Sequence, residues 1–175
     1  MHRQFETAKR QFQHQLYSYA YYSLRVAADA EDVVQEAFIR LWQHWQEIDQ
    51  LQLGAWLMRV TQNLIVDHVR KHKTRLATTD DEADFEMIAL EESDAHDSPH
   101  QRTLKRIVEH SIAKLGDPYR TTLILREIQG MSYEEIGEVL GISVDHVKTD
   151  LFRGKRKLRE IVSQHPLYHH DILSG

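Results

Sequence analysis

Five cations lie within seven residues in the stretch RGKRKLR, Arg153 to Arg159, near the C-terminal end of the sequence. Lysine and arginine side chains at this density attract phosphate groups whatever the base sequence. Polar residues one or two turns upstream, such as His146 and Thr149, are of the kind that hydrogen-bond to base edges. A second interpretation is also open, because cations in the last turns of any helix complement its macrodipole.

Two aspartates precede these cations in the same segment, at Asp145 and Asp150. A carboxylate near a DNA groove either accepts from a cytosine amino group or repels phosphate. Asp145 is compatible with the positive end of a helix without any role in DNA binding. Asp150 could instead face the protein and pair with a cation such as Lys157, and the sequence alone does not decide between these alternatives.

The residues that must position this surface predict two helices joined by a short turn. Ser132 and Glu135 have the S-x-x-E spacing of a capping box. Gly141 ends the first helix, and Ser143 is the cap candidate of the second. The second helix has one apolar line, made of Val144, Val147, Leu151 and Leu158, with Gly154 on the same line. If this line is buried, the polar and basic side chains face outward, as in a helix-turn-helix.

Helical periodicity also dominates the rest of the chain. Asp29 and Asp32 have the spacing of a helix start, and that helix is expected to end near Trp45. Another helix is expected to begin around Gly54 and to run into the basic end RKHKTR, residues 70–75. Upstream, residues 5–26 predict one or two helices packed on this pair. Ser98-Pro99 and Asp117-Pro118 are two further helix starts.

The charges divide the sequence into three parts. Residues 1–75 hold ten Lys or Arg and eight Asp or Glu, residues 76–101 hold nine acids and no base, and residues 102–175 hold twelve bases and ten acids. The net charge of −5 therefore hides two mildly basic blocks around an acidic segment. We predict an all-α protein of two small helical domains, residues 1–75 and 102–165. An acidic flexible linker, residues 76–101, joins them, and a tail follows at 166–175.

Three blocks of the sequence, taken together and in this order, resemble bacterial RNA polymerase sigma factors of the extracytoplasmic-function (ECF) type. The blocks are DAEDVVQEAFIRLW (residues 29–42), AWLMRVTQNLIVDHVRK (residues 55–71) and YRTTLILREIQGMSYEEIGEVLGISVDHVKTDLFRGKRKLR (residues 119–159). The resemblance implies a transcription initiation factor that binds core RNA polymerase, recognises and melts the promoter element at about −10, and reads the element at about −35. It also implies an anti-sigma factor as a partner.

The resemblance carries candidate site residues with it. Contacts to the core polymerase are implied for Asp32, Gln35, Glu36 and Arg40. DNA contacts at the −10 element are implied for Asn63, Asp67, Arg70, Lys71, Lys73 and Arg75, and at the −35 element for His146, Lys148, Thr149, Phe152, Arg153 and Lys157. The stretch QEIDQLQLG, residues 46–54, matches a loop that captures a flipped base, although it lacks the usual basic and serine-rich character. Trp42, Trp45 and Trp56 could stack on unpaired bases or belong to the core.

Other function classes find less support in the sequence. The chain has no cysteine, no H-E-x-x-H motif and no phosphate-cradling glycine loop, so we expect no enzyme, no cofactor and no metal. His165, His169 and His170 admit a metal site, but a solvated tail fits them better. A stand-alone helix-turn-helix regulator is the main alternative function. No run of residues is apolar enough for a membrane span, and we expect a cytoplasmic protein.

Overall fold

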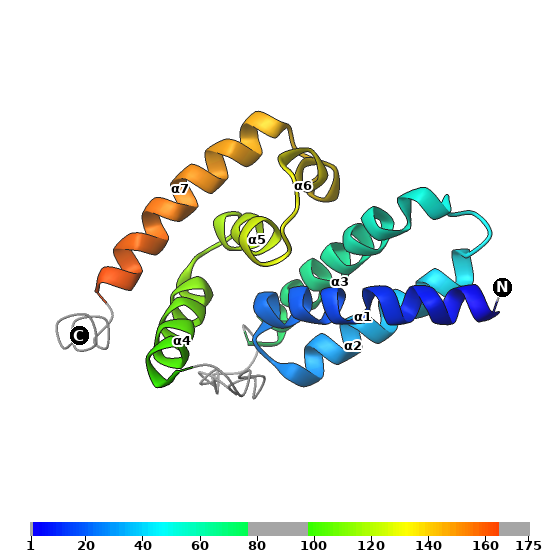
Figure 1. Ribbon diagram of the computed structural model, residues 1–175, viewed down its shortest axis with the longest axis horizontal. Helices are drawn as coiled ribbons and strands as arrows, with labels where there is room; N and C mark the ends of the chain where they lie inside the picture. The colour runs from blue at the N-terminus through cyan, green and yellow to red at the C-terminus, as the bar shows by residue number, and fades with distance from the viewer. Residues whose placement is uncertain (1, 77–97, 165–175) are drawn as a thin grey trace.

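The computed structural model describes residues 2–76 and 98–164, and residues 77–97, within the acidic linker, and 165–175 lie outside the described residues. The described part is helical and contains no strand, so the predicted all-α class is confirmed. Its helices form two groups that touch each other (Figure 1). His165, His169 and His170, the candidates for a metal site, are outside the described residues.

The first group contains three long helices, α1 (His2–Leu24), α2 (Ala27–His44) and α3 (Leu53–Leu76), with the short 3-10 helix η1 (Gln50–Gln52) before α3. The region 5–26 is thus one helix. The predicted cap at Asp29 is wrong, because α2 begins two residues earlier and Val26 occupies the cap position without a side-chain hydrogen bond. Asp29 lies instead in the first turn of α2, where its carboxylate is 3.0 Å from Nε2 of His68 on α3.

The second group begins with α4 (Pro99–Lys114), continues through α5 (Tyr119–Leu123) and the π-helical turn η2 (Ile124–Ile128), and ends with α6 (Tyr133–Leu140) and α7 (Val144–Ser163). Three of the predicted capping residues act as expected, whereas the start predicted at Asp117-Pro118 is displaced by one residue, because Pro118 itself occupies the cap position of α5 without a side-chain hydrogen bond. The Ser98 and Ser132 side chains accept from backbone N–H groups in complete capping boxes, and the Ser143 hydroxyl accepts from the N–H of His146 at 3.2 Å.

The turn between α6 and α7 depends on two glycines. Gly141 has φ 69°, the left-handed conformation that ends α6 at low cost only for glycine. A Cβ on Gly137 would lie 2.8 Å from the carbonyl oxygen of Ile142. The two helices can therefore approach each other this closely because Gly137 has no side chain.

The core continues from one group of helices into the other. Leu16, Leu41 and Leu57 are buried in the first group, and Ile124 and Ile136 are buried in the second. All five belong to one continuous set of buried apolar residues. α6 packs against α3, and α4 and η2 pack against α1. The two predicted domains thus share an apolar interface in this conformation.

Candidate nucleic-acid and polymerase interface

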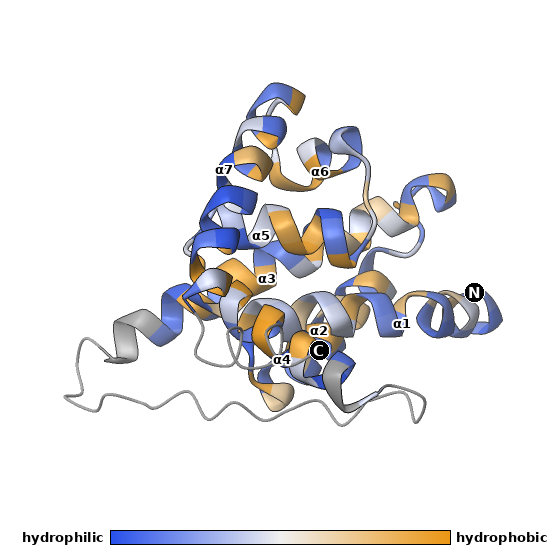
Figure 2. Cartoon of the chain, turned by 60° about the vertical axis from the view of Figure 1, so that its left-hand side comes forward, coloured by the Kyte–Doolittle hydropathy of each residue, from blue (hydrophilic) through white to orange (hydrophobic). Residues whose placement is uncertain are grey.

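The recognition helix candidate, α7, has the two faces that its sequence predicts. Val147 and Leu151 are buried, and a Cβ on Gly154 would lie 3.1 Å from Cδ1 of Leu123, so this side packs closely on α5. Figure 2 shows the rest of α7 as mainly hydrophilic. The six candidate −35 residues are all exposed: His146, Lys148, Thr149, Phe152, Arg153 and Lys157. α7 therefore presents them together on the outside of the molecule.

Particular contacts hold some of these side chains in place. The Thr149 hydroxyl donates to the Asp145 carbonyl at 2.9 Å, and the Lys148 ammonium lies 3.5 Å from the Asp145 carboxylate. The Lys157 ammonium lies 4.7 Å from the centroid of the Tyr119 ring. Phe152 is 70% exposed although it is aromatic. A solvent-facing aromatic ring among cations is suited to contact with a base or a sugar.

Asp150 does not belong to this outer face. Its residue exposure is 4%, its Oδ2 has no hydrogen-bond partner among the described residues, and the same atom lies 3.8 Å from Nε2 of His146. The alternative in which Asp150 faces the protein is therefore the one that the structure supports. Asp145, by contrast, has a 95% exposed side chain beside the outer face.

On α3 the candidate −10 residues lie along one side of the helix. Asn63 and Arg70 are exposed, and Asp67 between them is half-buried. The Arg70 guanidinium donates to the Asp67 carboxylate at 2.8 Å. Lys71 is exposed one residue further on. The side chains of Lys73 and Arg75, near the end of α3, lie outside the described residues.

The three tryptophans have different surroundings. Trp45 is 8% exposed and its ring packs edge-on against Phe5, so it is a core residue and not a stacking platform. Trp42 is 42% exposed and also meets Phe5 edge-on. Trp56 is half-buried, with its ring centroid 6.5 Å from that of His44. It lines a pocket of about 540 Å³ beside the segment that connects α2 to α3.

The candidate polymerase-binding residues lie on the outer side of α2. Asp32 and Gln35 are exposed, and the Arg40 guanidinium donates to the Glu36 carboxylate at 3.0 Å. The structure adds an apolar residue that the sequence reasoning missed, because Ile39 is 44% exposed on this side. The spacing in the sequence could have identified it, because Ile39 lies four residues after Gln35 and three after Glu36 and so shares their side of the helix. A groove of about 920 Å³ between α1 and α2 contains both Gln35 and Ile39.

Polar contacts tie the two groups of helices together. The Arg59 guanidinium on α3 donates to the Glu138 carbonyl on α6 at 2.7 Å, and the Tyr22 hydroxyl on α1 donates to the Glu109 carboxylate on α4 at 3.1 Å. The amide of Gln129 lies 3.3 Å from the hydroxyl of Ser18. Burial and the adjacent Glu109 carboxylate raise the pKa of Tyr22 to about 12.

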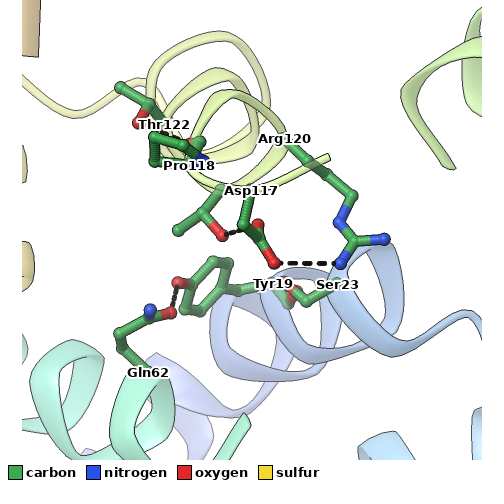
Figure 3. A network of polar contacts seen from close by, with 8 residues as sticks. Tyr19, Ser23, Gln62, Asp117, Pro118, Arg120 and Thr122 are labelled. Carbon is green, nitrogen blue, oxygen red and sulfur yellow. Dashed lines mark hydrogen bonds and ion pairs between the residues drawn. The ribbon is translucent and has the colours of Figure 1, made fainter. Parts of the chain in front are cut away.

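A further polar cluster lies where the chain enters α5, next to α1 and α3 (Figure 3). The buried Tyr19 hydroxyl donates to the Gln62 side chain, and Asp117 accepts from the Thr121 hydroxyl at 2.8 Å. The Arg120 guanidinium lies 3.2 Å from the Asp117 carboxylate. Burial, with a smaller effect of the Asp117 charge, raises the pKa of Tyr19. The phenol therefore remains a neutral hydrogen-bond donor inside the interface.

The fold and these surfaces define a two-part helical protein whose second part is a helix-turn-helix. The sigma-70 region 2 family matches residues 9–75, and the sigma-70 region 4 family matches residues 105–158. The chain is 33% identical over 156 residues to the ECF RNA polymerase sigma factor SigW of Bacillus subtilis, with 85% of this chain and 83% of that protein covered. It is 31% identical over 156 residues to the ECF RNA polymerase sigma factor SigE of Mycolicibacterium smegmatis. That match covers 89% of this chain but spans only 60% of the relative.

Among solved structures, the fold is similar to that of the sigma factor RpoE of Bartonella quintana, which was crystallised with the anti-sigma factor NepR. The TM-score is 0.77 at 20% identity, and the match covers 92% of this chain and 98% of the other. The chain belongs to the ECF family of RNA polymerase sigma factors. It is therefore a transcription initiation factor that directs RNA polymerase to promoters, as the sequence predicted, and not the stand-alone regulator that was the main alternative.

Proposed function

We propose that the two domains divide the work of promoter recognition between them. Residues 1–75 bind the core polymerase through the outer side of α2 and read and melt the −10 element through α3. Residues 102–165 read the −35 element through α7. The observation that carries this proposal is that the candidate −35 residues are exposed along one helix whose opposite side is fixed in the core by Val147, Leu151 and Gly154.

The charge on α7 supports a duplex-binding role. The cations from Arg153 to Arg159 are all exposed, and they attract phosphates on both sides of a major groove. His146 and Thr149 lie nearer the start of the helix, where side chains of a recognition helix meet base edges. The exposed Phe152 lies between these two sets and is placed to contact a base or a sugar.

The outer side of α2 supports a protein-binding role. It combines an exposed apolar side chain, Ile39, with the charged pair Glu36 and Arg40, and a groove adjoins it. An apolar centre with a polar rim is the usual anatomy of a protein interface. We assign this surface, with Asp32 and Gln35 at its edge, to the core polymerase.

A regulatory partner is part of the proposal. The sigma factor that the fold resembles was solved with an anti-sigma factor bound, and a protein of that class is a candidate partner here. Within residues 2–76 and 98–164, no helix combines the length and the apolar character needed to cross a bilayer. We place the site of action in the cytoplasm, where core polymerase and promoter DNA are found.

The proposed division of work is tested by reconstitution with core polymerase. The complex is presented with fragmented genomic DNA, and the bound and transcribed fragments are sequenced. We expect a shared pair of motifs near −35 and −10, and little specific binding by the free chain in a gel shift. Selected fragments without a common −35 motif would contradict the role of α7, and binding of equal strength without core polymerase would contradict the role of α2.

A further inference from the structure

Arg59 lies on the same side of α3 as the candidate −10 residues. It precedes Asn63 by four residues, and Asp67 and Arg70 follow at spacings of four and three, so the four side chains occupy successive turns of one helix face. Arg59 is exposed. It therefore extends this face by one turn, toward the segment that connects α2 to α3.

The surroundings of Arg59 are suited to an unpaired nucleotide. The pocket of about 540 Å³ beside it contains the rings of His44 and Trp56, whose centroids are 6.5 Å apart. Aromatic rings next to a cation are the usual means of holding a single-stranded base together with its phosphate. Two carboxylates in the same pocket are already engaged, because Glu47 lies 3.0 Å from the His44 ring and Asp49 accepts from the N–H of Leu51 at 2.9 Å.

In the conformation described, the second domain covers this position. Glu138 lines the same pocket, and its carbonyl accepts the hydrogen bond from Arg59 at 2.7 Å. Glu138 lies in the last turn of α6, where backbone carbonyls lack partners within the helix and the helix dipole is negative. The guanidinium thus caps α6. While it does so, the guanidinium is directed at the end of α6, and α6 itself covers one side of the pocket.

The promoter itself requires this contact to break, if the domains have the roles proposed above. Arg70 and His146, one candidate for each promoter element, line a single groove of about 900 Å³ between the domains. Elements at −10 and −35 are about 25 base pairs apart, which is roughly 85 Å along B-form DNA. Both helices can engage their elements only after the domains separate.

We infer that Arg59 is a further promoter-contacting residue, and that α6 of the second domain occupies it until the domains separate. This inference rests on the proposed division of work between the domains. Separation frees the guanidinium and removes an acidic residue, Glu138, from the lining of the pocket, so the site becomes more attractive to DNA in two ways. The Arg59–Glu138 contact then adds to the packing that keeps the free chain closed, and it leaves the −10 surface incomplete.

The inference is tested on the full chain with Arg59→Ala and with Arg106→Ala, a control at an exposed arginine on α4 outside the candidate sites. Because the chain has no cysteine, a Ser18→Cys/Gln129→Cys background allows a short bismaleimide to report domain closure. We expect Arg59→Ala to reduce the cross-linking yield of the free chain at least twofold. With core polymerase, we expect it to slow promoter opening about tenfold, as followed by 2-aminopurine fluorescence at the −10 element.

Three outcomes separate the possibilities. Promoter opening at the control rate would overturn the DNA contact, and an unchanged cross-linking yield would overturn the role in closure. Thermal unfolding of Arg59→Ala should match that of Arg106→Ala within a few degrees, which excludes general misfolding as the cause of either effect. If the unsubstituted chain does not open promoters with core polymerase, the proposed function fails, and that result is distinct from either failure of the inference.

Discussion

The buried carboxylate of Asp150 lies 3.8 Å from the imidazole of His146, one turn earlier on α7. One residue belongs to the interior and the other to the exposed face. The protein around Asp150 therefore screens this carboxylate from any group that approaches the exposed face of α7. The Asp150 carboxylate lies beside His146 on the inner side of α7, and the lysine and arginine side chains lie on the outer face.

Asp150→Asn is expected to leave promoter selectivity unchanged. The substitution removes a buried charge whose Oδ2 has no hydrogen-bond partner among the described residues, so we expect the free energy of unfolding to rise by about 1 kcal/mol at neutral pH. Thermal unfolding and transcription from a panel of −35 variants measure the two effects. A changed order of preference among the variants would show that Asp150 takes part in base recognition.

Gly137→Ala is expected to destabilise the helix-turn-helix. The new Cβ would meet the Ile142 carbonyl oxygen at 2.8 Å, and because the obstacle is backbone, relief requires the turn to move. We expect a loss of about 2 kcal/mol in the free energy of unfolding, since overpacking outweighs the better helix propensity of alanine. Gly116→Ala is the matched control, because its Cβ would enter open space. Equal stability of the two variants would contradict the close approach.

Ile39→Glu is expected to weaken binding to core polymerase. Burying a charge in the apolar centre of an interface costs desolvation free energy that no partner offsets. We therefore expect the affinity for core polymerase to fall at least tenfold, or about 1.4 kcal/mol. Val108→Glu, on α4, has similar initial exposure, 41% against 44%, and should bind as the unsubstituted chain does. Fluorescence anisotropy with labelled protein measures both. The assignment of α2 is wrong if the two variants bind equally well.

Arg153→Ala is expected to reduce both promoter affinity and its dependence on salt. One lost phosphate contact releases about one counterion fewer, so the slope of log affinity against log salt should become shallower by about one. Promoter binding by the holoenzyme is measured between about 50 and 200 mM salt, a range over which the affinity of such complexes changes by orders of magnitude. Arg106→Ala should retain the original slope. A uniform loss of affinity at an unchanged slope would place Arg153 away from phosphate.

Alkaline pH is expected to weaken the contact between the domains through Tyr22. Its pKa is raised to about 12 in the folded chain, while a tyrosine in an unfolded chain titrates at about 10. The folded state therefore holds the proton to higher pH, and the stabilisation is complete below pH 10 and is lost as pH rises toward 12. Tyr22→Phe should lose less stability than the unsubstituted chain between pH 9 and pH 11 in urea titrations. An identical loss of stability in both proteins would show that ionisation of Tyr22 does not cause the effect.

The sequence predicted the local features best. The caps at Ser98, Ser132 and Ser143 depend on hydrogen bonds between residues three apart in the chain. Such short-range patterns can be recognised from the sequence alone. The inward line of α7 was also legible from helical periodicity. The cap at Asp29 was mispredicted because α2 begins two residues earlier, and the Asp29 carboxylate instead meets His68, a partner 39 residues away that no local pattern reveals.

The contact between the domains lay beyond sequence reasoning for the same physical cause. Arg59 and Glu138 are 79 residues apart, and the acceptor is a backbone carbonyl, which every residue possesses. The type of side chain at position 138 therefore does not predict the contact with Arg59. The burial of Asp150 could not be predicted either, because a carboxylate at the seventh residue of a helix fits either face until the neighbouring helices are placed.

The continuous core that joins α3 to α6 has a consequence for how much of the protein is available to promoters. If only a small fraction of molecules is open at any moment, the apparent affinity for promoter DNA is lowered by that fraction, while the exposed α2 surface is available in both states. Substitutions that loosen this core should then raise promoter occupancy without altering any residue that touches DNA.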